Sequence, residues 1–158
     1  MTRAMFPAIG SIVLLALWLG AALIVAAVVA PAAFDVLPTR TLAGALVGRV
    51  LPVLFWSGSV IGLVVLWLGW RVPSAVPRSV AALVLVASAL VAQLVIAPQI
   101  ERIRARIGGP LEALDPSNPL RQSFGRLHGM SVACLGVGGV AALVILVLLV
   151  RFSTRSSP

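Results

Sequence analysis

The segment NPLRQSFGRLHGMS, residues 118–131, leads directly into the last long apolar run of the chain. It begins with a helix-start signal, because Asn118 is a preferred N-cap residue and Pro119 suits the first helical position. The segment also carries the single histidine, His128, together with Arg121 and Arg126. It therefore predicts a polar entrance to an apolar helix.

Composition identifies the lipid bilayer as the main solvent of the chain. Of the 158 residues, 61% are hydrophobic and 10% are charged, against roughly 45 to 50% and 25% in soluble globular domains. Four stretches reach the length of about 20 apolar residues that a membrane span needs. We predict an all-α fold, an integral membrane four-helix bundle that forms one domain over residues 1–158. The expected spans are 8–31, 50–70, 79–98 and 130–150.

Prolines mark the boundaries of the predicted spans. Pro31 and Pro38 bracket a turn after the first span, and Pro98 lies near the exit of the third, because proline disfavours helix for the residue before it. Pro52 predicts a kink or a break in the second helix. The second and fourth helices are expected to extend beyond the bilayer on one side.

The region after the third span is more polar. In residues 100–107, isoleucines share one helical stripe while Arg102 and Arg106 share another, which predicts a short amphipathic helix at the membrane interface. Residues 108–119 are dense in turn formers and form the expected long loop. Residues 71–78 form a short loop between the second and third spans.

Short motifs recur in the two halves of the chain. In each half, the first span ends in an aliphatic residue followed by Ala-Pro, and Gly-Arg precedes the second span, with two glycines four residues apart. This recurrence predicts two helical hairpins of similar plan that pack side by side. Chance recurrence in a sequence rich in these residues is the alternative explanation. The positions concerned are Pro31, Gly44, Gly48 and Arg49 in the first half and Pro98, Gly125, Arg126 and Gly129 in the second.

Arginine supplies all twelve basic residues, and the formal net charge is +8. Such an excess at a membrane indicates orientation signals and contact with anionic lipids. Nucleic-acid binding is not predicted, because the arginines are scattered among apolar helices. Four spans place both termini on one side, where the short loop and both tails are basic. We predict a protein of the bacterial inner (plasma) membrane with its termini in the cytoplasm.

Helical spacing places Arg121, Gly125 and His128 on one stripe, and ionisable groups at a membrane are functional candidates. The functional interpretation is a site for an anion or a lipid head group, with guanidinium donors and His128 as proton carrier or ligand. The structural alternative is that the arginines contact lipid phosphates and His128 caps a neighbouring carbonyl group. The candidate ligand-binding residues are Arg49, Arg121, Arg126 and His128.

Neither a cofactor nor a metal site is predicted. The single cysteine, Cys134, excludes a multi-cysteine zinc site, and the chain lacks a second His or Cys as a further metal ligand. His128 would bind haem only together with Met130, another axial group or a second subunit. Gln93, inside the third span, is interpreted either as an interhelical hydrogen-bonding residue or as a ligand of a substrate.

Small and aromatic residues within the spans predict packing. Gly58 and Gly62 form a pair that indicates a close helix contact. Most of the four tryptophans, Trp18, Trp56, Trp67 and Trp70, lie near the ends of the predicted spans, where aromatic belts form. Ser131 is interpreted as a packing residue or as a hydroxyl bonded to the backbone of its own helix.

The stretches WLGAALIVAAVVAPAAFDVLP, AGALVGRVLP and FGRLHGMS together resemble the transmembrane protein 205-like group, also called domain of unknown function 4149. The resemblance covers most of the chain, and it implies a four-helix integral membrane protein without carrying over a catalytic residue. The chain departs from the pattern at Leu51, where an aromatic residue is expected. The matching positions are Pro31, Gly44, Gly48, Arg49, Arg126, His128 and Ser131.

The leading hypothesis is a non-enzymatic membrane protein that binds or moves a small anionic or lipid-like molecule at a face formed by Arg49, Arg126 and His128. One alternative is a structural or accessory subunit of a larger membrane complex. Another is a membrane enzyme or haem carrier that uses His128. Membrane lipids are the expected partners. The chain is also a candidate for assembly into a homo-oligomer or a larger membrane complex.

Overall fold

The computed structural model describes residues 5–69 and 76–155, and the secondary structure in this part of the chain is entirely helical. Four helical stretches of 31, 30, 32 and 33 residues are long and apolar enough to cross a membrane. The predicted all-α four-helix bundle is confirmed, and the protein is an integral membrane protein. The helical elements are α1 (Met5–Ile24), η1 (Val25–Val29), α2 (Ala30–Val36), α3 (Arg40–Gly69), α4 (Val76–Leu90), η2 (Val91–Ile96), α5 (Ala97–Ile107), η3 (Leu111–Ala113) and α6 (Pro119–Arg155).

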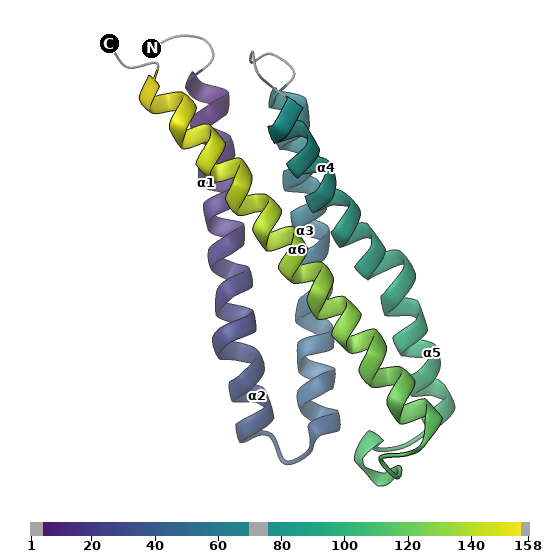
Figure 1. Ribbon diagram of the computed structural model, residues 1–158. Helices are drawn as coiled ribbons and strands as arrows, with labels where there is room; N and C mark the ends of the chain where they lie inside the picture. Colours follow the sequence, from purple (N-terminus) through teal and green to yellow (C-terminus); the bar gives the residue numbers. More distant parts are fainter. Residues whose placement is uncertain (1–4, 70–75, 156–158) are drawn as a thin grey trace.

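The four long helices form two hairpins. The first hairpin runs from α1 to α3 and the second from α4 to α6, and α1 begins where α6 ends (Figure 1). We call this the terminal end of the bundle, and we call the opposite end, where α2 joins α3 and α5 leads to α6, the loop end. The short loop predicted at 71–78 falls mostly outside the described residues.

A π-helical segment precedes the proline in the first and the third helix. Ala30 and Ala97, the residues immediately before Pro31 and Pro98, each donate the backbone N–H to the carbonyl five residues earlier. Proline has no N–H, and its ring clashes with the carbonyl four residues before it in an α-helix. In the wider π turn the backbone N–H groups bond to carbonyls five residues earlier instead of four. The hydrogen-bonding pattern around each proline is therefore changed, and the helix continues.

The turn predicted between Pro31 and Pro38 is therefore wrong, because residues 30–36 are helical, whereas the exit of the third span near Pro98 stays a prediction. The first helix continues to Val36 and the third to Ile107, so these two helices also exceed the length of a span, as the second and fourth were expected to. Residues 100–107 form the last turns of the third helix rather than a separate interfacial helix.

Two other local predictions concern Pro52 and the start of the last helix. The α3 helix runs through Pro52 as one helix, so the break is absent, while the kink predicted as its alternative stays a prediction. The predicted start of the last helix is confirmed, because α6 begins at Pro119 and the Asn118 side chain accepts a hydrogen bond from the Leu120 backbone N–H at 2.9 Å.

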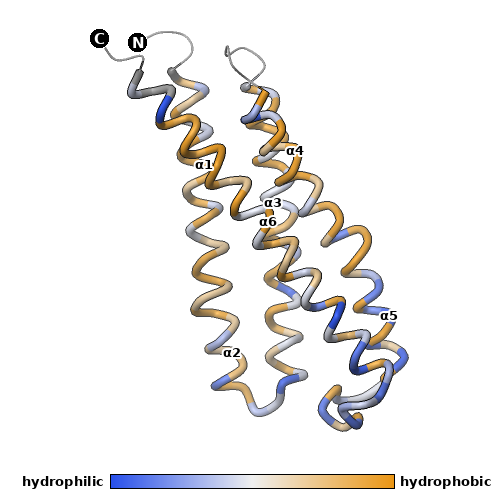
Figure 2. Tube along the Cα trace, viewed as in Figure 1, coloured by the Kyte–Doolittle hydropathy of each residue, from blue (hydrophilic) through white to orange (hydrophobic). Residues whose placement is uncertain are grey.

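The main core lies in the half of the bundle nearer the terminal end. Four of its most enclosed side chains, Leu15, Val65, Leu85 and Ile145, come from α1, α3, α4 and α6 respectively. Outside this core, large apolar side chains face outward along the helices, and the apolar positions dominate most of the bundle in Figure 2. This distribution fits helices whose outer surface contacts lipid.

Glycines of α3 allow the close helix contacts that the sequence predicted. A Cβ atom at Gly62 would lie 2.6 Å from Val86 Cγ2, and one at Gly58 would lie 2.8 Å from the Trp18 ring. Trp18 is 4% exposed and donates Nε1–H to the Leu54 carbonyl at 2.9 Å. The space over Gly58 therefore admits the Trp18 ring into the core.

The hairpins separate toward the loop end. There α5 and the beginning of α6 diverge from α3 (Figure 1). Polar positions concentrate on α5, on the beginning of α6 and on the connection between them (Figure 2). A membrane-spanning bundle with an apolar core at one end therefore has a polar, more open arrangement at the other.

Candidate functional site

A cleft of about 500 Å³ lies between the two hairpins at the loop end. One wall is α3, and the other consists of η2, α5, η3 and α6. Its volume falls within the roughly 300 to 1,000 Å³ of small-molecule sites. The lining residues include apolar side chains, among them Phe34, Val47, Leu51, Phe55, Ala92, Ala97, Ile100 and Ile107. The polar side chains of the lining are Arg40, Thr41, Gln93, Glu101, Arg104, Glu112, Arg121, His128 and Ser131.

Arg104 connects the two sides of this cleft. Its Nη2 donates a hydrogen bond to the Gly44 carbonyl of α3 at 3.2 Å, and its Nη1 lies 3.1 Å from the Glu101 carboxylate on its own helix. Gly44 and Gly48 have no side chains, so the guanidinium can lie against the backbone of α3. Arg104 thus forms a polar bridge between the hairpins.

Aromatic rings on α6 extend the surroundings of Arg104. Its Cζ atom lies 5.6 Å from the centroid of the Phe124 ring, a geometry typical of a cation–π contact. The Phe124 and His128 rings, one helical turn apart, are stacked with centroids 6.4 Å apart. His128 therefore lies along the cleft one turn farther from the loop end than Phe124.

The connection between α5 and α6 is attached to the first turn of α3. The Thr41 hydroxyl donates to the Glu112 carboxylate at 2.6 Å and accepts a hydrogen bond from the Leu111 backbone N–H at 3.3 Å. The side-chain hydrogen bond from Thr41 is the main cause that holds the pKa of Glu112 below its ordinary value, and the backbone N–H groups of Glu112 and Thr41 and, least, the charge of Arg121 act in the same direction. Arg121 itself donates to the Leu114 carbonyl at 2.6 Å.

A second carboxylate of this connection has a local role. Asp115 accepts hydrogen bonds from the side chain of Ser117 at 2.5 Å and from its backbone N–H at 2.8 Å. The Ser117 bonds lower the pKa of Asp115. Asp115 thus stabilises the turn before α6, whereas Glu112 joins the two hairpins.

Arg40 differs from the other arginines that line the cleft. It lies at the start of α3, and its side chain is exposed. Within the described part of the chain, this side chain makes no hydrogen bond or ion pair. Its guanidinium donors are therefore available to a ligand without breaking a contact of the protein.

The structure brings some of the sequence-predicted residues together and leaves others outside the cleft. Consecutive residues of an α-helix point about 100° apart. Gly48 and Gly125 line the cleft, and the arginines that follow them, Arg49 and Arg126, are exposed and lie outside its lining. As ligand-binding residues, all four candidates stay predictions. The predicted residues that line the cleft are Arg121, His128, Gly44, Gly48, Gly125 and Ser131, and those outside its lining are Arg49, Arg126, Pro31, Pro98 and Gly129.

Sequence reasoning missed Arg104 and Arg40. Arg104 lies three and four residues from Ile107 and Ile100, so it shares their helical stripe. An arginine on an otherwise apolar stripe indicates that its guanidinium contacts another part of the same chain. Arg40 gave no comparable signal, because its position depends on the approach of the second hairpin.

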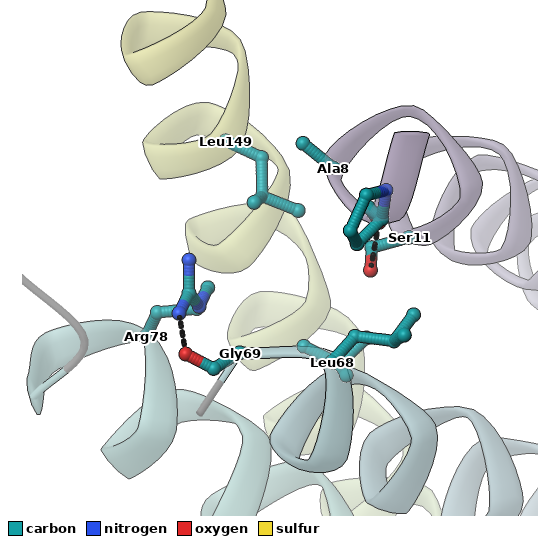
Figure 3. Close-up of a pocket in the computed structure, with 8 residues that line it drawn as sticks. Ala8, Ser11, Leu68, Gly69, Arg78 and Leu149 are labelled. Carbon is teal, nitrogen blue, oxygen red and sulfur yellow. Dashed lines mark hydrogen bonds between the residues drawn. The ribbon is translucent and has the colours of Figure 1, made fainter. Parts of the chain in front are cut away.

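A second cavity, near the terminal end, has a volume of about 10 Å³, which is about the space of one water molecule. Figure 3 shows Arg78 at its edge, where the side chain is 7% exposed and Nη2 donates to the Gly69 carbonyl at 2.8 Å. Gly69 ends α3, and an arginine that binds the last carbonyls stabilises a helix C-terminus. This contact explains the buried charge as part of the helix packing.

The two ends of the loop-end cleft differ in the chemistry of their lining. Guanidinium groups at its outer end and apolar side chains farther in suit a ligand that has an anionic and an apolar part. Among the described residues, no three His, Cys, Asp or Glu side chains are grouped as metal ligands. The expectation of no metal and no cofactor stays a prediction.

The helices and the cleft define a polytopic integral membrane protein with a ligand-sized space between two hairpins. The chain belongs to the family described as Domain of unknown function (DUF4149), whose model matches residues 13–108. The match extends from within α1 to the end of α5, so η3 and α6 lie beyond it. No curated protein and no solved structure matches the chain.

Proposed function

We propose that the protein binds a small anionic or lipid-like molecule in the loop-end cleft. The observation that carries this proposal is the cleft of about 500 Å³, which combines arginines at its outer end with apolar walls farther in. Buried apolar surface supplies binding free energy, and planar guanidinium groups recognise carboxylates and phosphates. The ligand would therefore lie with its anionic group toward the loop end.

The arginines of the cleft have different roles in this proposal. Arg40 supplies uncommitted donors, while Arg104 and Arg121 contribute positive charge and keep their contacts with the protein. The exposed Arg49 and Arg126 contact the phosphates of surrounding lipids, since arginine side chains extend toward head groups. Membrane lipids are thus partners of the protein whether or not they supply the ligand.

The proposal includes an orientation in the membrane. The short loop at 71–78 and both tails are basic, and basic residues near span ends favour the cytoplasmic side. We place the termini in the cytoplasm of a bacterial inner membrane, with the cleft toward the other side. A Ser117→Cys variant in a Cys134→Ser background should then react with a membrane-impermeant maleimide in intact cells, and protection from the reagent would reverse the orientation.

The narrower likeness to transmembrane protein 205-like proteins is part of the proposal as well. It is supported by FGRLHGMS, residues 124–131, which lie beyond the matched region of the family. This segment supplies Phe124, His128 and Ser131 to the cleft. The likeness assigns no activity, so the chemistry of the cleft remains the basis for the ligand.

The proposal is tested by native mass spectrometry of the protein released from nanodiscs. Arg40→Gln removes an arginine that lines the cleft, and Arg102→Gln removes an exposed arginine that does not line it. We expect wild type and Arg102→Gln to retain an adduct of defined mass and Arg40→Gln to lose most of it. Thermal melting should show that both variants are folded, because neither position is in the core.

The other results would contradict ligand binding. Bare protein in all three samples, or the same lipid adducts in all three, would remove the basis for the site. Consistent release of one protein partner from membranes, without a small-molecule adduct, would favour the accessory-subunit hypothesis instead.

A further inference from the structure

We infer that the inner end of the cleft, lined by Gln93, His128 and Ser131, is a hydrogen-bonding subsite for an uncharged oxygen group of the ligand. This inference rests on the proposed function and extends it. The ligand would be an organic anion that carries a hydroxyl or carbonyl group on its apolar part, away from the anionic head.

Ser131 provides the strongest observation. It is 7% exposed and lines the cleft from α6, and its hydroxyl makes no hydrogen bond with another described residue. Other serines of the helices, such as Ser59 and Ser88, bond to a carbonyl of their own helix. Among the described residues, every polar side-chain atom that is fully enclosed has a hydrogen-bond partner. Since the Ser131 hydroxyl has no such partner, it is not fully enclosed, and it is open to the cleft that Ser131 lines.

Gln93, which is half-buried, and His128, which is exposed, also line the cleft, and they belong to two different helices. Gln93 lines the cleft from η2, and its amide makes no hydrogen bond within the described part of the chain. The ring of His128 stacks on the Phe124 ring. Its ring nitrogens make no hydrogen bond with another described residue. The η2 segment packs against α6, so these side chains belong to one region of the cleft.

Unpaired polar groups at this depth favour a ligand that can satisfy them. Gln93 and Ser131 lie within membrane-crossing helices, where a polar group without a hydrogen-bond partner costs free energy. A ligand oxygen can accept from the Gln93 amide and from the Ser131 hydroxyl. A purely hydrocarbon tail would leave these groups unpaired and would bind less well.

The spacing along α6 gives a rough length for the part of the cleft between Arg121 and the subsite. Ser131 is ten residues beyond Arg121 and His128 is seven, which at 1.5 Å per residue corresponds to roughly 15 and 10 Å along the helix axis. Apolar side chains, including Leu51 and Phe55 of α3, line the same region. These dimensions fit a medium-length chain with an acid at one end and an oxygen group at the other.

The test compares two probes, decanoate and 10-hydroxydecanoate, which differ by one hydroxyl group. Each probe is titrated against the protein in nanodiscs, and the bound fraction is measured by native mass spectrometry. We expect wild type to prefer the hydroxylated acid by about three- to tenfold, the effect of one or two net hydrogen bonds. Gln93→Leu and Ser131→Ala should each reduce this preference toward one.

Matched controls separate the subsite from general effects on folding. Gln99→Leu changes an exposed glutamine outside the cleft lining, and Ser57→Ala removes a hydroxyl that bonds to its own helix. Both controls should keep the preference for 10-hydroxydecanoate. Thermal melting of each variant identifies any that is unfolded, and Gln93→Leu and Ser131→Ala provide two independent tests.

The results distinguish this inference from the proposed function. If decanoate and 10-hydroxydecanoate bind wild type equally, and both depend on Arg40, the cleft binds anions but the subsite does not exist. Retention of the preference in both Gln93→Leu and Ser131→Ala would also overturn the subsite. If neither acid binds in an Arg40-dependent manner, the proposed function fails for this class of ligand and the inference fails with it.

Discussion

Glycines four residues apart occur twice on α3, and the two pairs contribute to opposite ends of the bundle. Gly58 and Gly62 allow the side chains of α1 and α4 to pack into the core, whereas Gly44 and Gly48 face Arg104 and the cleft. The absence of a side chain creates a tight contact in one place and leaves ligand-sized space in the other. The difference lies in the helix opposite, which is close at the terminal end and has diverged at the loop end.

The two ends are also held together by different interactions. At the terminal end, apolar side chains from four helices share one core. At the loop end, the hairpins are joined by the hydrogen bond from Arg104 to Gly44 and by the contacts of Thr41 with the α5–α6 connection. Regions with few buried apolar contacts open at lower free-energy cost, so the loop end should open while the terminal end remains packed.

The largest expected effect comes from filling the space at Gly62. In Gly62→Leu the new Cβ would lie within 2.6 Å of Val86 Cγ2, which forces α3 and α4 apart and should lower the free energy of unfolding by about 1 to 3 kcal/mol. Thermal or denaturant unfolding in detergent measures this loss. Gly136→Leu is the matched control, because no atom lies within 4 Å of a Cβ there. Equal effects of the two substitutions would contradict the assigned packing.

A smaller and more local effect is expected at Arg104. Arg104→Gln removes the ion pair with Glu101 and weakens the bridge to Gly44, contacts that are partly exposed and together stabilise by about 1 kcal/mol. Hydrogen exchange should rise in residues 40–50 and stay unchanged around Val65 in the core. Arg106→Gln, on an exposed position of the same helix, should leave both regions unchanged. A uniform rise across α3 would show that the two ends do not open separately.

The smallest expected effect depends on pH. The hydrogen bond from Thr41 lowers the pKa of Glu112, so the contact stabilises the folded protein above the ordinary carboxyl pKa of about 4 and is lost as pH falls through the lowered value. After correction for intrinsic rates, hydrogen exchange at residues 40–43 should rise in acid for wild type.

Glu112→Gln should show this increased exchange already at neutral pH, while Asp115→Asn, which loses contacts with Ser117, should not. Exchange at residues 40–43 that is the same in wild type and Glu112→Gln at every pH would show that this carboxylate does not hold the connection against α3.

Local sequence signals were sufficient wherever a feature depended on residues close together in the chain. The apolar runs determined four membrane-crossing helices, and the Asn118–Pro119 pair determined where the last one begins. The Gly58 and Gly62 pair correctly indicated a close helix contact. These features follow from hydropathy, capping and side-chain volume, which act locally.

Prolines gave a weaker signal, because their effect depends on the hydrogen bonding of the turn around them. A turn was expected after Pro31, yet Pro31 and Pro98 each follow a π-helical segment and both helices continue. The same arrangement in both hairpins agrees with the predicted repeat. The repeat itself stays a prediction, with chance recurrence as the alternative.

Tertiary structure alone decided which polar residues of different helices meet. Helical spacing already placed Arg121 and His128 on one stripe, but the sequence did not determine that Arg40 and Arg104 face the same cleft as these two residues while Arg49 does not. A helical residue's neighbours depend on the rotation of its helix and on the direction of the helix opposite. Both are set by packing between residues far apart in the chain, such as Gly62 with Val86, at the other end of the bundle.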